Sequence, residues 1–232
     1  MIVSQNAIGS VSGGSLLAWY HRLGIRTRLR RRFVDAHRRY HEDGGETLLT
    51  DFDLTSQSVV VDVGGYTGKW SSDLFSRFLC RIHILEPIPT FAAKLRTRFQ
   101  YNPLITVTEA ALGSVGRDEV FRISGDATSA FIKRGEVHHV RIVSAVEWFA
   151  KMKLDHIDLM TMNCEGGEYE ILPHLIETGL AKKIDRFLIQ FHDYKHLDAK
   201  AARDRITESL ARTHQRTMCY PFLWEKWVRL DN

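Results

Sequence analysis

The sequence predicts an α/β domain in which a mostly parallel, seven-stranded sheet lies between two layers of helices, preceded by a basic N-terminal helix. Three observations support this prediction. Strand-like apolar runs alternate with helix-period segments along the chain, which is typical of parallel sheets with crossover helices. The first strong run, Val59–Val61, leads into a glycine-rich turn. The last two runs can form a hairpin, which puts one antiparallel strand on the sheet.

Length and composition fit one main domain, residues 46–232, after a helical extension formed by residues 1–45. With 232 residues and 44% hydrophobic content, the chain can bury one full core. It contains no run of roughly 18 apolar residues, the length that a membrane span needs. Its three cysteines are widely spaced and form no C-x-x-C pair, which favours reduced thiols and a cytoplasmic protein.

The positive charge is concentrated in the N-terminal segment. Residues 1–40 hold eight arginines and one acid, a charge of +7. Because the whole chain has a net charge of +4, the rest of it carries −3. Residues 15–42 have helical spacing, with Gly24 as a break. Three interpretations stay open: a basic helix packed on the domain, a helix that contacts anionic membrane or phosphate groups, and a targeting peptide. The mildly acidic main domain argues against nucleic acid as a partner.

The glycine-rich turn follows a short strand of β-branched residues and predicts a nucleotide-type site. The dinucleotide fingerprint needs glycines at positions one, three and six of its loop, whereas here they fall at one, two and five. A plain strand-end turn is the alternative. The cofactor-binding candidates of this loop are Asp62, Gly64, Gly65, Tyr66 and Gly68.

The next elements extend the same site. A helix is predicted over Thr67–Phe78 and a second strand over Arg81–Leu85, which ends in Glu86. A carboxylate at this strand tip is where nucleotide-binding α/β folds hold ribose hydroxyls, and an ordinary strand-end acid is the alternative. A further helix and a third strand, Leu104–Ala111, follow, and Ala111 joins the cofactor-binding candidates.

The middle of the chain is less regular. Two β-rich runs, Val120–Ile123 and Val140–Val143, surround the polar segment Ser124–Ser129. The pattern predicts a loop there, and two interpretations stay open: a loop that covers the substrate and a loop that is merely mobile. The remaining predicted elements are a helix at Ala145–Lys151, a fourth strand at Ile157–Met162, a helix ending near Gly179, a fifth strand at Arg186–Phe191, a polar helix at 197–213 and two strands at Met218–Phe222 and Trp224–Leu230.

The fourth and fifth strands end in polar residues that add a second half to the site. Asn163 and Glu165 follow the fourth strand, and His192 follows the fifth. In open α/β sheets, ligands bind beyond the carboxyl ends of the strands, near the point where the strand order reverses. We therefore expect these side chains to lie close to Asp62 and Glu86 at one edge of the sheet, which we call the rim.

Three segments together resemble the FkbM family of S-adenosylmethionine (SAM) dependent methyltransferases. They are Val60-Val-Asp-Val-Gly-Gly-Tyr-Thr-Gly68, Leu85-Glu-Pro87 and Ile157-Asp-Leu-Met-Thr-Met-Asn-Cys-Glu-Gly-Gly-Glu-Tyr-Glu-Ile-Leu172. The resemblance implies a class I methyltransferase (Rossmann-like) fold, SAM as cofactor, and methyl transfer to oxygen. It also implies an acceptor among sugars or glycans, including lipid-linked ones. The family usually has aspartate at the position of Asn163.

The catalytic candidates are Glu165, His192 and Asn163. Asparagine cannot take up a proton, so we rank Glu165 and His192 first as the base, with Glu168 and Asp193 behind them. A strand-end histidine satisfied by backbone groups, and a helix-capping role for Glu165, are the alternatives. A divalent metal on Asn163, Glu165 and His192 is not favoured, because the site lacks the aspartate charge.

The sequence therefore predicts a SAM-dependent O-methyltransferase that acts on a hydroxyl of a sugar, glycan or related small polar molecule. The alternatives are a nucleic-acid methyltransferase and a non-catalytic relative that binds membrane or partners through residues 15–42. The acceptor and the oligomeric state stay undetermined by sequence.

Overall fold

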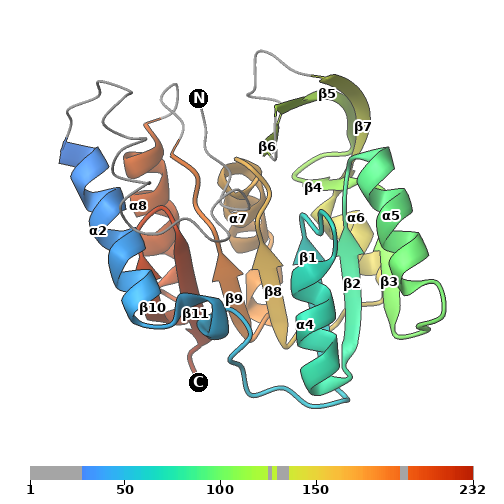
Figure 1. Cartoon of the computed structure of the whole chain (residues 1–232), viewed down its shortest axis with the longest axis horizontal. Helices are drawn as coiled ribbons and strands as arrows, with labels where there is room; N and C mark the ends of the chain where they lie inside the picture. The colour runs from blue at the N-terminus through green and yellow to red at the C-terminus, as the bar shows by residue number, and fades with distance from the viewer. Residues whose placement is uncertain (1–27, 125–126, 130–135, 194–197, 232) are drawn as a thin grey trace.

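The computed structural model describes residues 28–124, 127–129, 136–193 and 198–231 (Figure 1). The predictions for the N-terminal tail, for residues 15–27 and for the break at Gly24 lie outside these residues. Within the described part, no helix combines the length and the apolar character that crossing a bilayer requires.

The main sheet has seven strands in the order β10-β11-β9-β8-β1-β2-β3. β11 runs antiparallel to both of its neighbours, and the other neighbouring pairs are parallel. The predicted sheet with one antiparallel strand is thus confirmed. The chain proceeds from β1 to β2 and β3 and then returns to β8 on the other side of β1, so the strand order reverses between β1 and β8. The strands are β1 (Val59–Val63), β2 (Arg81–Leu85), β3 (Ile105–Thr108), β8 (Leu159–Met162), β9 (Arg186–Ile189), β10 (His214–Tyr220) and β11 (Trp224–Arg229).

Helices cover both faces of this sheet, which gives the predicted three layers (Figure 1). Strand side chains alternate between two apolar clusters, as the pleat requires. Val60 packs in the cluster that includes residues of α2, α4 and α5, whereas Val61 and Val63 pack in the cluster that includes residues of α6, α7 and α8. The helices are α2 (Arg28–Glu42), α3 (Gly45–Leu48), α4 (Lys69–Phe78), α5 (Pro89–Phe99), α6 (Ala145–Met152), α7 (Glu168–Glu177), α8 (Ala199–Leu210) and the 3₁₀ turn η2 (Leu180–Lys183).

α2 packs against the β10 edge of the main sheet. Ala36 and Tyr40 of α2 are buried. The ring of Tyr40 meets the edge of Tyr220 at a centroid distance of 5.4 Å, and the Tyr220 hydroxyl donates to Asp43 at 2.6 Å. The described part of this segment, α2, therefore packs on the domain.

A second sheet that the sequence did not predict follows β3. Its order is β4-β7-β5-β6, with strands β4 (Ala111–Gly113), β5 (Arg117–Ser124), β6 (Ala127–Ser129) and β7 (Glu136–Ser144). The predicted third strand was too long: β3 ends at Thr108, and Ala111 pairs with Ile142 of β7 instead. The expected loop at Ser124–Ser129 was also partly wrong, because Ala127–Ser129 is a strand and residues 125–126 lie outside the description. Strand pairing, of β4 with distant β7 and of β6 with β5, sets these boundaries rather than local composition.

An ionic fork ties the second sheet to α7. Arg117 donates from its two terminal nitrogens to the two carboxylate oxygens of Glu170, at 2.9 and 2.8 Å. The backbone N–H and the hydroxyl of Ser114 donate to the same carboxylate. The Arg117 guanidinium accordingly lowers the pKa of Glu170 to about 2.

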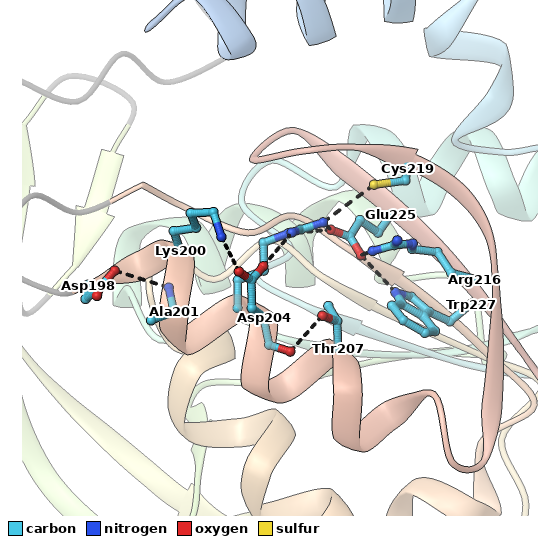
Figure 2. Close-up of polar contacts among 10 residues, drawn as sticks. Asp198, Lys200, Ala201, Asp204, Thr207, Arg216, Cys219, Glu225 and Trp227 are labelled. Carbon is cyan, nitrogen blue, oxygen red and sulfur yellow. Dashed lines mark hydrogen bonds and ion pairs between the residues drawn. The ribbon is translucent and has the colours of Figure 1, made fainter. Parts of the chain in front are cut away.

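A buried ionic cluster fixes α8 to β11 at the other end of the main sheet (Figure 2). Glu225, whose residue surface is 1% exposed, accepts hydrogen bonds from Nε of Arg203 at 2.6 Å and from the indole of Trp227 at 3.2 Å. Arg216 lies 3.5 Å from the same carboxylate. We call Arg203, Arg216, Glu225 and Trp227 the sheet-edge cluster. It borders an open groove of about 710 Å³ between α8 and β10–β11.

Candidate active site

The glycine-rich loop after β1 is shaped by close contact with β8 and α5. Gly64 has φ +93°, and a Cβ there would lie 2.1 Å from the backbone oxygen of Asn163. Gly68 has φ +77°, and a Cβ there would lie 2.7 Å from Leu95. Glycine is therefore required both by backbone conformation and by packing. The contact at Gly64 also brings the loop after β1 directly against the loop after β8.

Asp62 points to the helix that follows this loop. Its buried carboxylate accepts a hydrogen bond from the Ser71 hydroxyl of α4 at 2.5 Å. Burial raises the pKa of Asp62 to about 6, although the bond from Ser71 works in the opposite direction. The sequence analysis missed Ser71, because no local pattern connects it with a residue nine positions earlier.

Glu86 lies at the tip of β2, as predicted, and braces the glycine-rich loop. One carboxylate oxygen accepts the N–H of Tyr66 at 2.8 Å, and the other accepts the N–H of Ile88 at 2.9 Å. Burial raises the pKa of Glu86 to about 7 despite these two bonds, and the Asp62 carboxylate adds to the increase. Each carboxylate oxygen has a further lone pair, so the side chain can also accept bonds from ribose hydroxyls.

The other cofactor-binding candidates lie in the chain just after the ends of β1 and β3. Gly65 donates its N–H to the Leu85 carbonyl at 3.2 Å. Tyr66 has φ +48°, and its ring contacts the edge of Phe91 at a centroid distance of 4.6 Å. Ala111 is half-buried at the start of β4, three residues past the end of β3.

The loop between β8 and α7 carries the catalytic candidates. The N–H of Asn163 donates to the Val63 carbonyl at 3.0 Å, which extends the ladder between β8 and β1 by one residue. Glu165 and Gly166 then turn the chain with φ of +48° and +103°. A positive φ at a non-glycine residue is uncommon and marks a strained backbone at Glu165.

Glu165, Glu168 and His192 form a second buried ionic cluster, which we call the site cluster. Glu168 is fully buried and accepts hydrogen bonds from the N–H of His192 at 2.8 Å, from Nδ1 of His192 at 3.0 Å, from the N–H of Gly166 at 2.9 Å and from the thiol of Cys164 at 3.7 Å. Nε2 of His192 lies 3.4 Å from Glu165. The hydroxyl of Tyr169 donates to the His192 carbonyl at 2.7 Å.

His192 is held as a cation by these two carboxylates. Burial by itself lowers the pKa of His192, but Glu168 and Glu165 together outweigh burial and raise it to about 10. This pKa lies well above the ordinary histidine value near 6.5, so the imidazole is protonated throughout the neutral range. As a cation it has no lone pair with which to accept a proton or bind a metal.

The structure also bears on the weaker candidates. Glu168 anchors His192 from inside the protein, a role that its rank in the sequence analysis understated, while Asp193 is exposed. At the start of α7, the N-cap is Gly167 without a side-chain hydrogen bond. Within the described residues, a different trio, His156, Asp158 and Asp185, has metal-ligand spacing, and it precedes β8 and β9 rather than following them.

These features define the class of the protein. A seven-stranded sheet in this order, with β11 antiparallel and a glycine-rich loop after β1, is the class I methyltransferase fold, and it supports SAM as cofactor. The chain belongs to the FkbM methyltransferase family: the family model described as "Methyltransferase FkbM domain" matches residues 62–211. It is accordingly a SAM-dependent methyltransferase.

Other comparisons add distant structural likeness. No curated protein sequence matches the chain. Similar solved structures include precorrin-6y C5,15-methyltransferase from Geobacter metallireducens (13% identity, 80% of this chain and 87% of that one, TM-score 0.49). Fibrillarin from Aeropyrum pernix, solved with natively bound SAM, has 10% identity over 79% and 72% of the two chains (TM-score 0.46). An rRNA methylase from Streptococcus thermophilus has 11% identity over 77% and 90% (TM-score 0.47).

Proposed function

We propose that the protein is a SAM-dependent O-methyltransferase whose acceptor is a hydroxyl of a sugar, glycan or related small polar molecule. The observation that carries the proposal is the position of the Glu165 carboxylate. It lies on the loop that touches the glycine-rich loop through Gly64 and Asn163, and it is paired with the cationic His192. A proton acceptor thus stands beside the predicted cofactor site.

In this proposal the loop after β1 and the tip of β2 hold the cofactor. Asp62, fixed by Ser71, and Glu86, fixed by two backbone N–H groups, form acidic anchors at the strand ends. When bound, SAM supplies an electrophilic methyl group on a positively charged sulfur. Catalysis by the chain then consists mainly of holding the acceptor oxygen in line with that methyl group.

The proton of the acceptor hydroxyl is assigned to Glu165. With SAM bound, methylation of the acceptor oxygen would make the hydroxyl acidic, and the Glu165 carboxylate would accept its proton. His192 keeps a positive charge beside Glu165, and Glu168 keeps His192 in place. A positioned base of this kind adds roughly 10²–10⁴-fold to the rate.

Cofactor binding is tested by calorimetry on the wild-type chain and on Asp62→Ala and Glu86→Ala. Both variants are expected to lose measurable SAM affinity while circular dichroism shows a folded protein. Glu177→Gln, at the exposed end of α7, is the control and should bind SAM as the wild type does. Unchanged affinity in both site variants would refute the cofactor assignment.

The acceptor class is tested with SAM labelled on the methyl group. Candidate glycans, lipid-linked sugars and RNA are offered in parallel, and base-stable label on sugar hydroxyls is the expected result. Label on RNA, with binding that weakens steeply as salt increases, would replace the proposal with the nucleic-acid alternative.

A further inference from the structure

Gln190 is a buried polar residue that the sequence analysis did not single out. It follows β9 directly and is only 6% exposed, and its side-chain oxygen Oε1 is buried without a hydrogen-bond partner. Its backbone N–H donates to the Met162 carbonyl at 2.9 Å, so the residue is fixed in line with the strand. Buried amide oxygens are almost always hydrogen-bonded in native proteins, so an exception calls for an explanation.

The strand pattern places Gln190 next to Asn163. Met162 pairs with Ile189 between β8 and β9, so the next pair along the register is Asn163 with Gln190. Met162 and Ile189 pack in the cluster on the α6–α8 face, and side chains alternate along strands. Asn163 and Gln190 therefore both project toward the α2–α4 face. On the other side of Gln190, the register with β11 puts the buried Trp224.

We propose that Gln190 is an acceptor-binding residue, and that its amide and the amide of Asn163 together hydrogen-bond adjacent hydroxyl groups of a neutral, polyhydroxylated acceptor. This inference rests on the proposed function, because it places the acceptor beside Glu165 on the same loop as Asn163. A sugar hydroxyl is both a donor and an acceptor, and so is a carboxamide, whereas neither amide offers charge to an anionic substrate. The acceptor would supply the hydrogen bond that Oε1 lacks.

The first experiment needs no acceptor and separates a binding role from a structural one. Gln190→Met keeps the volume and removes the unsatisfied oxygen. If Gln190 is kept for binding, the variant should melt at the same temperature as the wild type or up to about 4 °C higher, with unchanged SAM affinity. The exposed Gln215→Met on β10 is the matched control. A fall of several degrees in Gln190→Met alone would mean that the amide is structural and would overturn the proposal.

The second experiment measures transfer of labelled methyl from SAM to the methyl glycosides of glucose, galactose, mannose and rhamnose, and to the matched glucuronide and galacturonide. We expect the wild type to methylate at least one neutral glycoside and to prefer it over its acidic counterpart. In Gln190→Met, KM for that glycoside should rise about tenfold with a smaller change in kcat, and Gln190→Asn should recover part of the loss.

Three outcomes of this second experiment would also overturn the inference. These are an unchanged KM in Gln190→Met, preference for the acidic glycosides, and no transfer to any neutral glycoside by a protein that binds SAM. In the last case the cofactor assignment stands and only the neutral-sugar acceptor falls. If the wild type does not bind SAM, the proposed function itself is refuted.

Discussion

The site cluster and the sheet-edge cluster are both buried and ionic, but they have opposite compositions. In the site cluster, two carboxylates surround one histidine, and Glu168 at its centre is fully buried. In the sheet-edge cluster, two arginines surround one carboxylate, and Glu225 at its centre is 1% exposed. The two are neighbours, since β11 pairs with β9 and the Arg203 guanidinium lies 5.7 Å from the ring of Phe191, next to His192.

The difference separates a responsive site from a fixed one. Arginine does not lose its proton in proteins, so the two cations of the sheet-edge cluster keep their charge at any working pH. His192 of the site cluster is different, because its two carboxylate partners set its pKa at about 10 and its charge is lost when the pH rises through that value. The backbone follows the same division: the sheet-edge cluster is built on α8, β10 and β11, whereas Glu165 and His192 lie on loops after strands. We therefore expect changes in one cluster to affect chemistry and changes in the other to affect stability.

The largest expected effect is on chemistry. Glu165→Gln keeps the shape of the side chain and removes the proposed proton acceptor, so the methyl-transfer rate should fall by about 10²–10⁴-fold. SAM affinity and the melting temperature should stay near those of the wild type. Glu177→Gln is again the control. Normal turnover in Glu165→Gln would remove the distinction between the two clusters.

The next effect is on stability. Arg203→Met leaves the buried Glu225 with only the more distant Arg216 as a cation, and should lower the free energy of unfolding by roughly 3–5 kcal/mol. Urea melts measure this, and calorimetry should find SAM affinity unchanged. The double variant Arg203→Met/Glu225→Leu should recover most of the loss, because no buried charge then lacks its partner. If it recovers nothing, the arginine acts through its contact with Phe191 instead.

A smaller effect concerns the protonation of His192. Its pKa in the folded chain, about 10, lies above the unfolded value near 6.5. Its contribution to stability is therefore fully present below pH 6.5 and is lost as the pH rises through 10. Glu168→Gln removes the strongest carboxylate partner and should lower this pKa by at least about one unit. NMR titration of the imidazole carbon checks the shift, and an unchanged pKa would mean that Glu165 alone holds the proton.

The smallest effect is a pH dependence of cofactor binding. The pKa of Glu86 is raised to about 7, and ribose hydroxyls donate best to its ionised form. SAM affinity should therefore rise roughly fourfold between pH 6.5 and 8.5, since about a quarter of Glu86 is ionised at the lower pH. Glu86→Gln serves as the reference, because the pH profile of its SAM affinity still contains the titration of SAM itself but not that of Glu86. Parallel pH profiles for the two proteins would contradict the assignment.

Local patterns in the sequence were sufficient for the main sheet and for the position of the rim. Runs such as Val59–Val61 alternate with helix-period segments, and polar residues at strand ends mark where parallel strands deliver their side chains. Asp62, Glu86, Asn163, Glu165 and His192 could therefore be assigned to one edge before any contact was known, and the structure places each of them after or at the end of its strand.

The sequence by itself thus predicted the seven strands of the main sheet, its antiparallel strand and the polar residues at the strand ends, because periodicity and strand-end chemistry depend on neighbours along the chain. Only the tertiary structure decided the second sheet, the bond from Ser71 to Asp62, the cationic state of His192 and the unsatisfied oxygen of Gln190. Each of these depends on segments that are far apart in sequence. The free energy of a buried charge or amide is set by what folding brings around it, and no local pattern encodes that.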